Sequence, residues 1–422
     1  MLAENRIAPP APKPAREAGL GVAEQLRPRV FVFRWGGIDR SPHVVTLLNF
    51  LAQQKFRTTL ATVEAGVRPG SLSRSVGLLS LGRNSLSGRS KLLRMFGIAW
   101  QFRKTVRSYG ADILYVIDSW TLPVVLLGAL GGRLAPAFVY HTFDWLDPAL
   151  YRTIRTIHLW YERWACLRAD LCVNVDRSRT RMMQSFYGLP TAPLWIPNFP
   201  ERQARAPQRD EGLRAELLGP RGRFLMVCPS RLHLELMRAT ALLPEYYRLL
   251  TFRGAGAYAE QCVRFVESSR LGGRVTFLEP CAYEELARYV LCADVGIILN
   301  DWKRSSGYYM ANSGRLANFL WASVPVVVSD VPNLEALVYK WRLGESCDAY
   351  EPASIAESIR KTVEGAPGIE ERRLAVRRAF QEELHFERRG MLLASEMARL
   401  CRVNVGQGQD LKAPAEVRVY SS

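Results

Sequence analysis

The feature that most constrains this chain is a regular alternation of short apolar runs with helical patterns, repeated in two series. Such an alternation is typical of parallel strands joined by helices that cover both faces of a sheet. The runs of the first series lie at 29–35 (RVFVFRW), 57–63, 113–117, 137–142 and 171–175. Those of the second lie at 223–228, 247–252, 275–278, 295–299 and 326–329. The sequence therefore predicts an α/β protein with two Rossmann-like parallel-sheet domains that face a cleft.

The length of 422 residues fits two domains of this kind. Alanine, proline and charged residues dominate the first 29 positions, and the loop 196–200 with the polar stretch 201–211 is typical of a linker. We expect a disordered arm at 1–29, an N-terminal domain at 30–200, a C-terminal domain at 201–370, a helix at 371–402 that packs back toward the N-terminal domain, and a flexible tail at 403–422.

The composition narrows the class of protein. Hydrophobic residues make up 48% of the chain, which excludes wholesale disorder. The eight cysteines form no C-x-x-C pair and no zinc-binding spacing with histidine, so we expect reduced cysteines and no bound metal. The sequence shows no secretory leader and no apolar run of the ~18 residues that a membrane span needs. We therefore expect a cytoplasmic protein.

The net charge of +17 favours anionic ligands such as phosphate-bearing substrates, anionic lipid or nucleic acid. Nine basic residues and no acid lie between Glu64 and Asp112, interleaved with apolar residues that include Phe96 and Trp100. This pattern is equally typical of a basic amphipathic helix on an anionic membrane and of a helix that packs on the sheet with its arginines in water. Residues 65–111 are thus a candidate for peripheral contact with the inner face of the cell membrane. No nucleic-acid reading motif is found, so nucleic acid is not expected as a partner.

Two local motifs could bind a nucleotide. The first, RGAGAYA at 253–259, follows a predicted strand and fits the pattern G-x-G-x-x-A. Glu279, 25 residues after Gly254, ends the next predicted strand, where dinucleotide folds place a ribose-binding acid. This combination suggests an NAD-dependent oxidoreductase as one alternative. The other is a tight turn that lets a helix pack closely on a strand.

The second motif lies in the long segment 300–325 between two predicted strands, where Ser313-Gly314 precedes a predicted helix at 315–322. The free N–H groups and the positive end of the helix dipole make such a helix start an anion site, and a diphosphate fits it. An ordinary helix cap after a long loop is the alternative.

Four stretches of the chain, taken in order, resemble the GT-B glycosyltransferases of the family 4 type. These enzymes move a sugar from a nucleotide diphosphate donor. The stretches are Glu162-Arg163 with Ala169-Asp170 before LCVNV, Ile196-Pro197-Asn198, the series VTFLEP and YEELARYVLCADVGIIL, and the run GRLANFLWASVPVVVSDVPNLEALV from Gly314. The last run is the most specific. The resemblance, from about Val30 to Glu364, implies a GT-B fold with an acceptor-binding N-terminal domain and a C-terminal domain that binds the nucleotide sugar.

For the C-terminal domain, the resemblance implies a donor site and a pair of basic residues, Arg231 and Arg238, that neutralise the leaving diphosphate. The candidate donor-binding residues are Ser313, Gly314, Arg315, Asn318, Gly254 and Glu279. The chain departs from the family at Met310 and Asn318, which stand where the family has Glu. An amide at 318 can still hydrogen-bond the ribose diol, but without charge. The identity of the donor therefore stays open.

For the N-terminal domain, the resemblance implies that Gly36, Gly37 and Arg40 form a loop that lets an acceptor or a donor phosphate approach the backbone. His141 and Asp144, at the end of a predicted strand, are the candidate catalytic residues beside the transferred sugar. A buried structural histidine is the alternative for His141. The chain has no D-x-D motif, so the resemblance implies transfer without a catalytic metal or another cofactor.

The sequence thus predicts a hexosyltransferase-like, metal-independent glycosyltransferase that acts with retention in polysaccharide biosynthesis. Its donor is a nucleotide diphosphate sugar, and its acceptor is lipid-linked or a polysaccharide. Two alternatives remain. One is a non-catalytic member that binds a nucleotide sugar or serves as a scaffold in a polysaccharide assembly complex, and the other is the NAD-dependent oxidoreductase.

Overall fold

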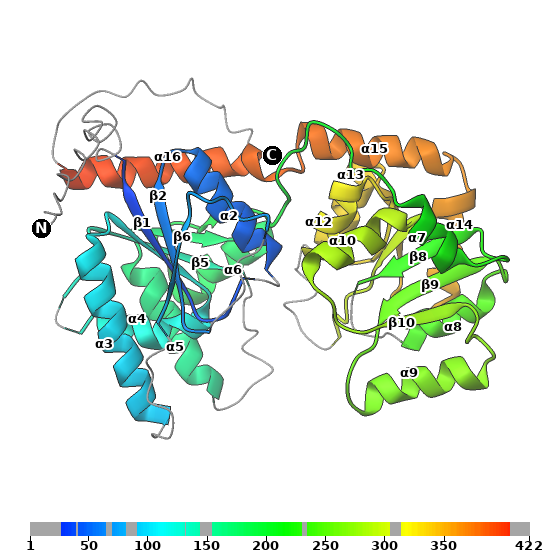
Figure 1. The fold of residues 1–422 in the computed structure, drawn as a ribbon, viewed down its shortest axis with the longest axis horizontal. Helices are drawn as coiled ribbons and strands as arrows, with labels where there is room; N and C mark the ends of the chain where they lie inside the picture. Colours follow the sequence, from blue (N-terminus) through cyan, green and yellow to red (C-terminus); the bar gives the residue numbers. More distant parts are fainter. Residues whose placement is uncertain are drawn as a thin grey trace, which may run out of the picture.

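The computed structural model describes residues 27–38, 41–64, 70–81, 91–130, 132–143, 154–229, 234–303 and 314–405. Within these ranges the chain forms a seven-stranded sheet and a six-stranded sheet, and neighbouring strands pair in parallel throughout both (Figure 1). Each sheet has helices on both faces, as parallel strands require. The predicted α/β class with two parallel-sheet domains is confirmed.

The N-terminal sheet has the strand order β3-β2-β1-β4-β5-β6-β7. Its strands are β1 (Arg29–Arg34), β2 (Arg57–Thr62), β3 (Gly77–Ser80), β4 (Ile113–Ile117), β5 (Ala137–Thr142), β6 (Leu171–Asn174) and β7 (Leu194–Trp195). One face packs against α2 (Pro42–Gln53) and α16 (Phe386–Val405). The other packs against α3 (Lys91–Tyr109), α4 (Leu122–Gly128), α5 (Ile154–Arg168) and α6 (Arg177–Tyr187).

The C-terminal sheet has the strand order β10-β9-β8-β11-β12-β13. Its strands are β8 (Phe224–Cys228), β9 (Tyr247–Phe252), β10 (Val275–Leu278), β11 (Val295–Ile298), β12 (Val326–Ser329) and β13 (Gly344–Cys347). One face is covered by α8 (Leu234–Leu242), α9 (Ala257–Ser268) and α14 (Pro352–Glu364). The other is covered by α7 (Glu211–Leu218), α10 (Tyr283–Cys292), α12 (Gly314–Ala322), α13 (Pro332–Trp341) and α15 (Ile369–Glu382).

Three strands lack a clear sequence signal, and all three lie at sheet edges. They are β3 and β7 at the two ends of the first sheet and β13 at one end of the second. An edge strand pairs on one side only and needs fewer apolar residues than a central strand. The sequences of β3 (GLLS) and β13 (GESC) are short and partly polar, and β7 has two residues, so their apolar pattern is too weak to read.

The last helical pattern is two helices with a break at 383–385, which the sequence pattern does not show. The first, α15, packs in the core of the C-terminal domain, and α16 lies along the N-terminal domain, where the rings of Phe386 and Phe50 are 5.2 Å apart (Figure 1). Hydrogen bonds tie this crossing to the linker: Phe386 N donates to Pro200 O at 2.9 Å, and Gln381 Nε2 to Gln203 O at 2.7 Å.

The two domains also meet directly through the start of α13 and the start of α6. Asn333 Nδ2 donates to Asp176 Oδ1 at 3.1 Å, and Ser178 Oγ donates to Asn333 Oδ1 at 2.9 Å. Asp176 is the N-cap residue of α6 and also accepts from the backbone N–H groups of Ser178 and Arg179. A polar bridge therefore joins one helix start of each domain.

The helix α12, which begins next to the expected donor site, packs tightly on β11. Gly296 in this strand allows the approach, because a Cβ added there would overlap the buried ring of Phe319. Forcing a methyl group into a well-packed core costs about 1–3 kcal/mol. We therefore expect Gly296→Ala to lower the free energy of unfolding by that amount, measured by urea denaturation.

Gly273, between α9 and β10, is a matched control because an added Cβ would meet no atom there within 4 Å. Gly273→Ala should change the free energy of unfolding by less than about 0.5 kcal/mol. Equal stability of the Gly296→Ala and Gly273→Ala proteins would contradict the close packing of α12.

Candidate functional site

Each sheet has one position at which the direction of strand addition reverses. In the C-terminal sheet, β9 and β10 are added on one side of β8, and β11, β12 and β13 on the other. In the N-terminal sheet the reversal lies between β1 and β4. Open α/β sheets bind ligands beyond the carboxyl ends of the strands at such positions. Ligand-binding residues are therefore expected at these two edges.

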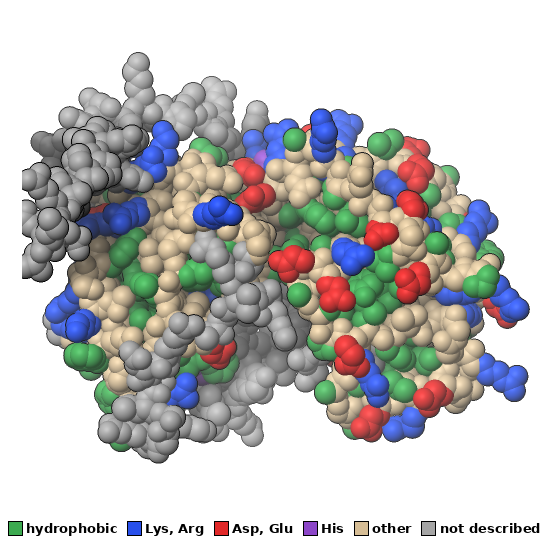
Figure 2. Space-filling view, viewed as in Figure 1, with side chains coloured by type: hydrophobic (Ala, Val, Ile, Leu, Met, Phe, Trp, Pro, Cys, Tyr) green, Lys and Arg blue, Asp and Glu red, His purple; other side chains and the backbone are tan. Residues whose placement is uncertain are grey.

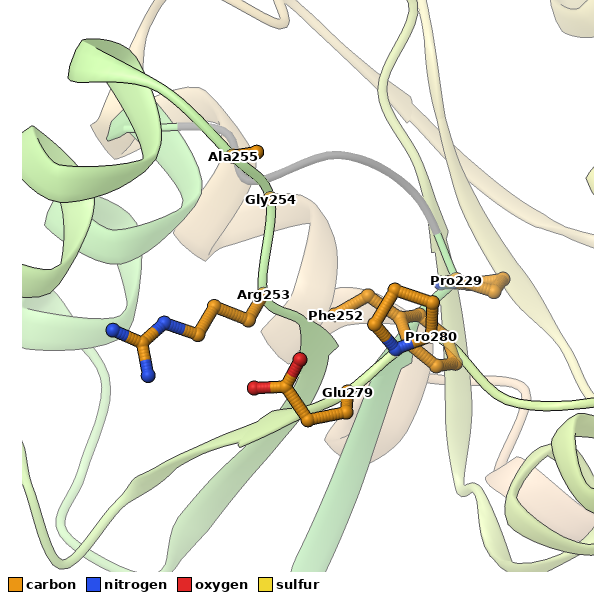
Figure 3. Close-up of a pocket in the computed structure, with 7 residues that line it drawn as sticks. All are labelled: Pro229, Phe252, Arg253, Gly254, Ala255, Glu279 and Pro280. Atoms are coloured by element: carbon orange, nitrogen blue, oxygen red, sulfur yellow. The ribbon is translucent and has the colours of Figure 1, made fainter.

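A pocket of about 690 Å³ lies at the carboxyl edge of the C-terminal sheet. Its volume is typical of a small-molecule site. The lining residues end or follow β8, β9 and β10 and are Pro229, Phe252, Arg253, Gly254, Ala255, Glu279 and Pro280. Figure 3 shows the side chains of Arg253 and Glu279 leaving the strand ends on the same side. The pocket thus offers an apolar wall, a cation, an anion and a stretch of glycine-bearing backbone.

The G-x-G-x-x-A motif forms the turn from β9 into α9. Gly256 is the N-cap residue of α9 with φ 89°, in the region that favours glycine. A Cβ added to Gly254 would lie 3.4 Å from the Cβ of Ala259, so the turn packs closely on the helix. Packing therefore accounts for the spacing of this motif. Two of the predicted donor-binding residues, Gly254 and Glu279, both line the pocket.

The start of α12 holds three further predicted residues, none of which is among those that line this pocket. Gly314 is the exposed first residue of the helix. Arg315 donates to Asn300 Oδ1 at 2.7 Å and to Leu299 O at 3.4 Å, so its guanidinium holds the segment that follows β11. The Asn318 Oδ1 atom accepts from the hydroxyl of Tyr283 at 3.3 Å. Burial raises the pKa of Tyr283 to about 12, so this hydroxyl keeps its proton.

Arg238 is exposed on α8 and is not among the residues that line the pocket. Arg231, Ser313, Asp144 and Arg40 lie outside the described residues. The structure therefore brings Gly254 and Glu279 together, and it places Arg315 and Asn318 beside the end of β11 and α10.

At the N-terminal edge, Arg34 organises the loop that follows β1. Its guanidinium donates to Gly37 O at 3.0 Å and lies 3.8 Å from the carboxylate of Asp118, which directly follows β4. Asp118 has φ 65°, which is uncommon for a residue other than glycine and typical of functional sites. A Cβ added to Gly36 would lie 3.6 Å from Glu64 Oε2. The Gly36-Gly37 loop thus lies close to the residue Glu64 after β2, and Arg34 links it to Asp118 after β4.

His141 lies in a buried aromatic cluster at the same edge. Its Nδ1 atom is 2.7 Å from the hydroxyl of Tyr115, and its ring stacks on Phe143 at 4.3 Å. The ring of His43 lies 4.4 Å from Phe143 on the side of α2. Burial lowers the pKa of His141 to about 3, with a smaller effect of His43. Burial, followed by the charge of Arg34, lowers the pKa of His43 to about 3 as well. Both imidazoles are therefore neutral at pH 7. This state agrees with the alternative in which His141 is a buried structural histidine.

Three residues of this edge were not predicted from the sequence: Arg34, His43 and Asp118. A signal was available for Asp118, because a polar residue that directly follows a buried strand lies at the carboxyl edge. His43 follows Pro42 in the first turn of α2, and no local pattern shows that its ring meets Phe143 from another strand end.

Glu162 of α5 is a buried carboxyl group held by hydroxyls. It accepts from Tyr140 at 2.8 Å and from Tyr187 at 2.6 Å. Burial raises the pKa of Glu162, and the hydrogen bonds from Tyr187 and Tyr140 oppose part of this rise. The folded protein therefore binds a proton at Glu162 more tightly than the unfolded chain, for which the ordinary value is 4.5. The protonated carboxyl stabilises the fold below pH 4.5, and this contribution is lost as the pH rises through the folded-state pKa.

We expect Glu162→Gln, which keeps the shape and a hydrogen-bonding oxygen without the titration, to remove this pH dependence. The difference in free energy of unfolding, variant minus parent, should increase as the pH rises from 4.5 toward 7. Chemical denaturation of both proteins at several pH values measures it. A difference that stays constant, or that falls with pH, would contradict the assignment.

Neither a metal site nor a membrane span is found in the ranges given above. No group of three or more His, Cys, Asp or Glu in this part of the chain could hold a metal ion. No helix among these residues is long and apolar enough to cross a membrane. The eight cysteines carry free thiols.

Comparisons with known proteins match both the architecture and part of the sequence. Residues 35–199 match the family model of Glycosyltransferase Family 4. Sucrose-phosphate synthase from Thermosynechococcus elongatus superposes with a TM-score of 0.68 at 15% identity, over 89% of this chain and 99% of its own. The chain has the GT-B fold. HepE from Anabaena, in complex with UDP and glucose, gives a TM-score of 0.68 at 15% identity, over 88% of this chain and 100% of its own.

A third GT-B structure is WaaG, a glycosyltransferase involved in lipopolysaccharide biosynthesis. Its TM-score is 0.62 at 14% identity, over 87% of this chain and 99% of WaaG. A comparison with curated proteins finds no match. The resemblance to GT-B glycosyltransferases predicted from the sequence is confirmed, and it favours a transferase over the oxidoreductase alternative. The family match lies in the N-terminal domain, whereas the most specific stretch predicted from the sequence lies in the C-terminal domain.

Proposed function

We propose that this GT-B protein transfers a hexose-like sugar from a nucleotide diphosphate sugar to a lipid-linked or polysaccharide acceptor. The observation that carries the proposal is the pocket of about 690 Å³ at the carboxyl ends of β8, β9 and β10, beside the reversal point of the C-terminal sheet. The HepE structure holds UDP and glucose, which supports UDP-glucose as the first donor to test. WaaG acts in lipopolysaccharide biosynthesis, which supports a glycan acceptor.

Different residues of the C-terminal domain are proposed to bind the nucleoside and the diphosphate of the donor. The carboxylate of Glu279 and the backbone at Gly254 bind the nucleoside, and Asn318 hydrogen-bonds the ribose. The helix start at Ser313-Gly314 and the guanidinium groups of Arg231 and Arg238 stabilise the leaving diphosphate. We propose retention of configuration and metal-independent transfer, with the basic side chains in the role that a metal ion fills elsewhere.

In the N-terminal domain, the proposed roles belong to residues at the carboxyl edge of the sheet, near the reversal between β1 and β4. The Gly36-Gly37 loop with Arg40 lets the acceptor or a donor phosphate approach the backbone, and His141 or Asp144 orients the transferred sugar. Arg34 holds this loop through its hydrogen bond to Gly37 O, and the carboxylate of Asp118 lies beside the Arg34 guanidinium.

A bulky side chain in the pocket should block the donor. Ala255 is an exposed lining residue, and Ala257, two residues on, is exposed at the start of α9 without lining the pocket. We expect Ala255→Trp to weaken the binding of UDP and UDP-glucose at least about tenfold, and Ala257→Trp to change it less than about twofold. Isothermal titration calorimetry measures both, and a donor-hydrolysis assay follows turnover.

The same experiment separates the alternative function. Turnover of the donor identifies an enzyme, whereas binding of UDP without turnover of any donor identifies the non-catalytic binding or scaffold member. Equal binding of UDP and UDP-glucose by the two tryptophan variants would show that the donor does not bind in this pocket.

We further propose that the layer α3–α5 contacts an anionic membrane surface. Ile98, Phe102 and Val106 of α3 pack in the core below the sheet, so the helix has one face on the protein. Leu93, Phe96 and Trp100 are 54%, 54% and 66% exposed and point away from that core. The cations Lys104 and Arg107 continue the same stripe at intervals of three and four residues, and Lys104 Nζ lies 5.4 Å from the Trp100 ring centroid. The helix thus fits both alternatives predicted from its sequence.

The neighbouring elements add to this surface. Trp120 and Trp160 are 57% and 56% exposed, and with Trp100 they are the exposed tryptophans of the described residues. Tryptophan and basic residues are typical of membrane interfaces. In the view of Figure 2, basic and hydrophobic side chains lie along the outer edge where Figure 1 draws α3, whereas most of the visible acidic side chains lie on the C-terminal domain.

Each basic residue near an anionic surface contributes about 1 kcal/mol, which is about fivefold in binding. We therefore expect Lys104→Glu to reduce binding to vesicles that contain phosphatidylglycerol at least about fivefold, measured by sedimentation. Arg399 on α16 is exposed on the opposite face of the same domain, and Arg399→Glu is the control. An equal loss in both variants, or equal binding of the parent to phosphatidylcholine vesicles, would contradict docking through this layer.

A further inference from the structure

A second pocket lies in the N-terminal domain, between α4, the segment that follows α4, and the last turns of α5. Its volume is about 570 Å³. Two of its lining residues, Leu114 and Phe138, are the second residues of β4 and β5, so the pocket lies at the amino edge of the sheet. The described candidate site residues of this domain, Gly36, Gly37 and His141, lie at the carboxyl edge. The pocket is therefore separate from the proposed site of sugar transfer.

Most of the side chains that line this pocket are apolar. They include Leu126, Leu130 and Leu134 of α4 and its following segment, together with Trp164 from α5. The rings of Phe138 and Trp164 lie 6.4 Å apart, and both residues are half-buried. An apolar cavity of this size that opens to water is typical of a binding site for an apolar group.

The mouth of the pocket carries positive charge. Arg133 is 69% exposed, donates to Pro136 O at 3.0 Å and lies 3.4 Å from Asp170. Arg168 is exposed, and no hydrogen-bond or ion-pair partner is found for it within the part of the chain that the structure describes. Two guanidinium groups thus flank an apolar cavity, which is the complement of a hydrocarbon chain attached to a phosphate.

The pocket is continuous with the exposed layer of α3–α5. Trp160, Trp164 and Arg168 follow one another at intervals of four along α5 and so share one face of the helix. Trp160 is exposed, Trp164 lines the pocket and Arg168 lies at its mouth. On the other side, Arg103 of α3 donates to the carbonyl oxygens of Gly128 and Leu130 at 2.7 Å, which fixes the rim next to the basic helix.

We propose that this pocket binds one acyl chain of an anionic phospholipid, with its phosphate between Arg168 and Arg133. The lipid is a component of the membrane and not the glycosyl acceptor, because the pocket lies at the edge of the sheet opposite to the proposed transfer site. The inference rests on the proposed membrane contact of the same layer. Withdrawal of one acyl chain into the protein adds buried apolar area to the surface contact of α3 and so lengthens its stay on the membrane.

Dodecyl phosphate, used as a monomer below its micelle-forming concentration, tests the pocket without a membrane. We expect one molecule to bind per chain by calorimetry. Ala135→Trp, which places an indole in the pocket, should weaken binding at least tenfold, whereas Ala353→Trp, at an exposed position of α14, should leave it unchanged. Retained UDP affinity and an unchanged circular dichroism spectrum show that the Ala135→Trp protein is folded.

A second variant tests the charge without disturbing the core. Arg168→Glu, at an exposed position, should weaken dodecyl phosphate binding at least fivefold, and Arg399→Glu should not. Dodecyltrimethylammonium should bind more weakly than dodecyl phosphate, and inorganic phosphate alone should not bind detectably. Unchanged affinity in both Ala135→Trp and Arg168→Glu, or equal affinity for the cationic amphiphile, would overturn the proposal. Because dodecyl phosphate is monomeric, its binding reports on the pocket alone, whereas vesicle sedimentation reports on the membrane contact of α3.

Discussion

Parallel pairing is the constraint on which the rest of this molecule depends. Strands that all run in one direction end at one edge of their sheet, and the helices between them must return over its faces. Polar residues that follow strands therefore lie at the carboxyl edge of their own sheet: Asp118 after β4 at that of the N-terminal sheet, and Glu279 after β10 at that of the C-terminal sheet. The close packing of α12 on Gly296 keeps the helix start beside the same edge.

The buried polar groups of the N-terminal domain show how burial determines charge there. Burial disfavours the ionised form of every titratable group, so it lowers the pKa of His141 and raises that of Glu162. Both effects reduce charge within the domain core, and hydroxyls of Tyr115, Tyr140 and Tyr187 supply the hydrogen bonds. Arg34 and Asp118, at the carboxyl edge of the N-terminal sheet, are charged and partly exposed.

The fold could be predicted from the sequence because the central strands are buried on both faces and read as unbroken apolar runs. The edge strands β3, β7 and β13 could not, because pairing on one side needs little apolar sequence. The break between α15 and α16 was not predicted, because the helical pattern runs through it without interruption. The sequence pattern does not show that the chain passes there from one domain to the other. The position of Gly254 and Glu279 at the pocket could be predicted from spacing, since a motif after a strand has a fixed place at the sheet edge. His43, the partners of Arg315 and the hydrogen bond between Tyr283 and Asn318 depend on contacts between distant elements, which a local pattern does not contain.

The bridge from Asn333 to Asp176 and Ser178 has a consequence for motion. Two neutral or singly charged hydrogen bonds of this kind contribute only about 0.5 to 3 kcal/mol each. The linker and the passage from α15 to α16 keep the domains covalently and sterically joined when the bridge is broken. Breaking the contact between these two helix starts therefore costs little free energy, whereas the continuous chain still holds the two domains together.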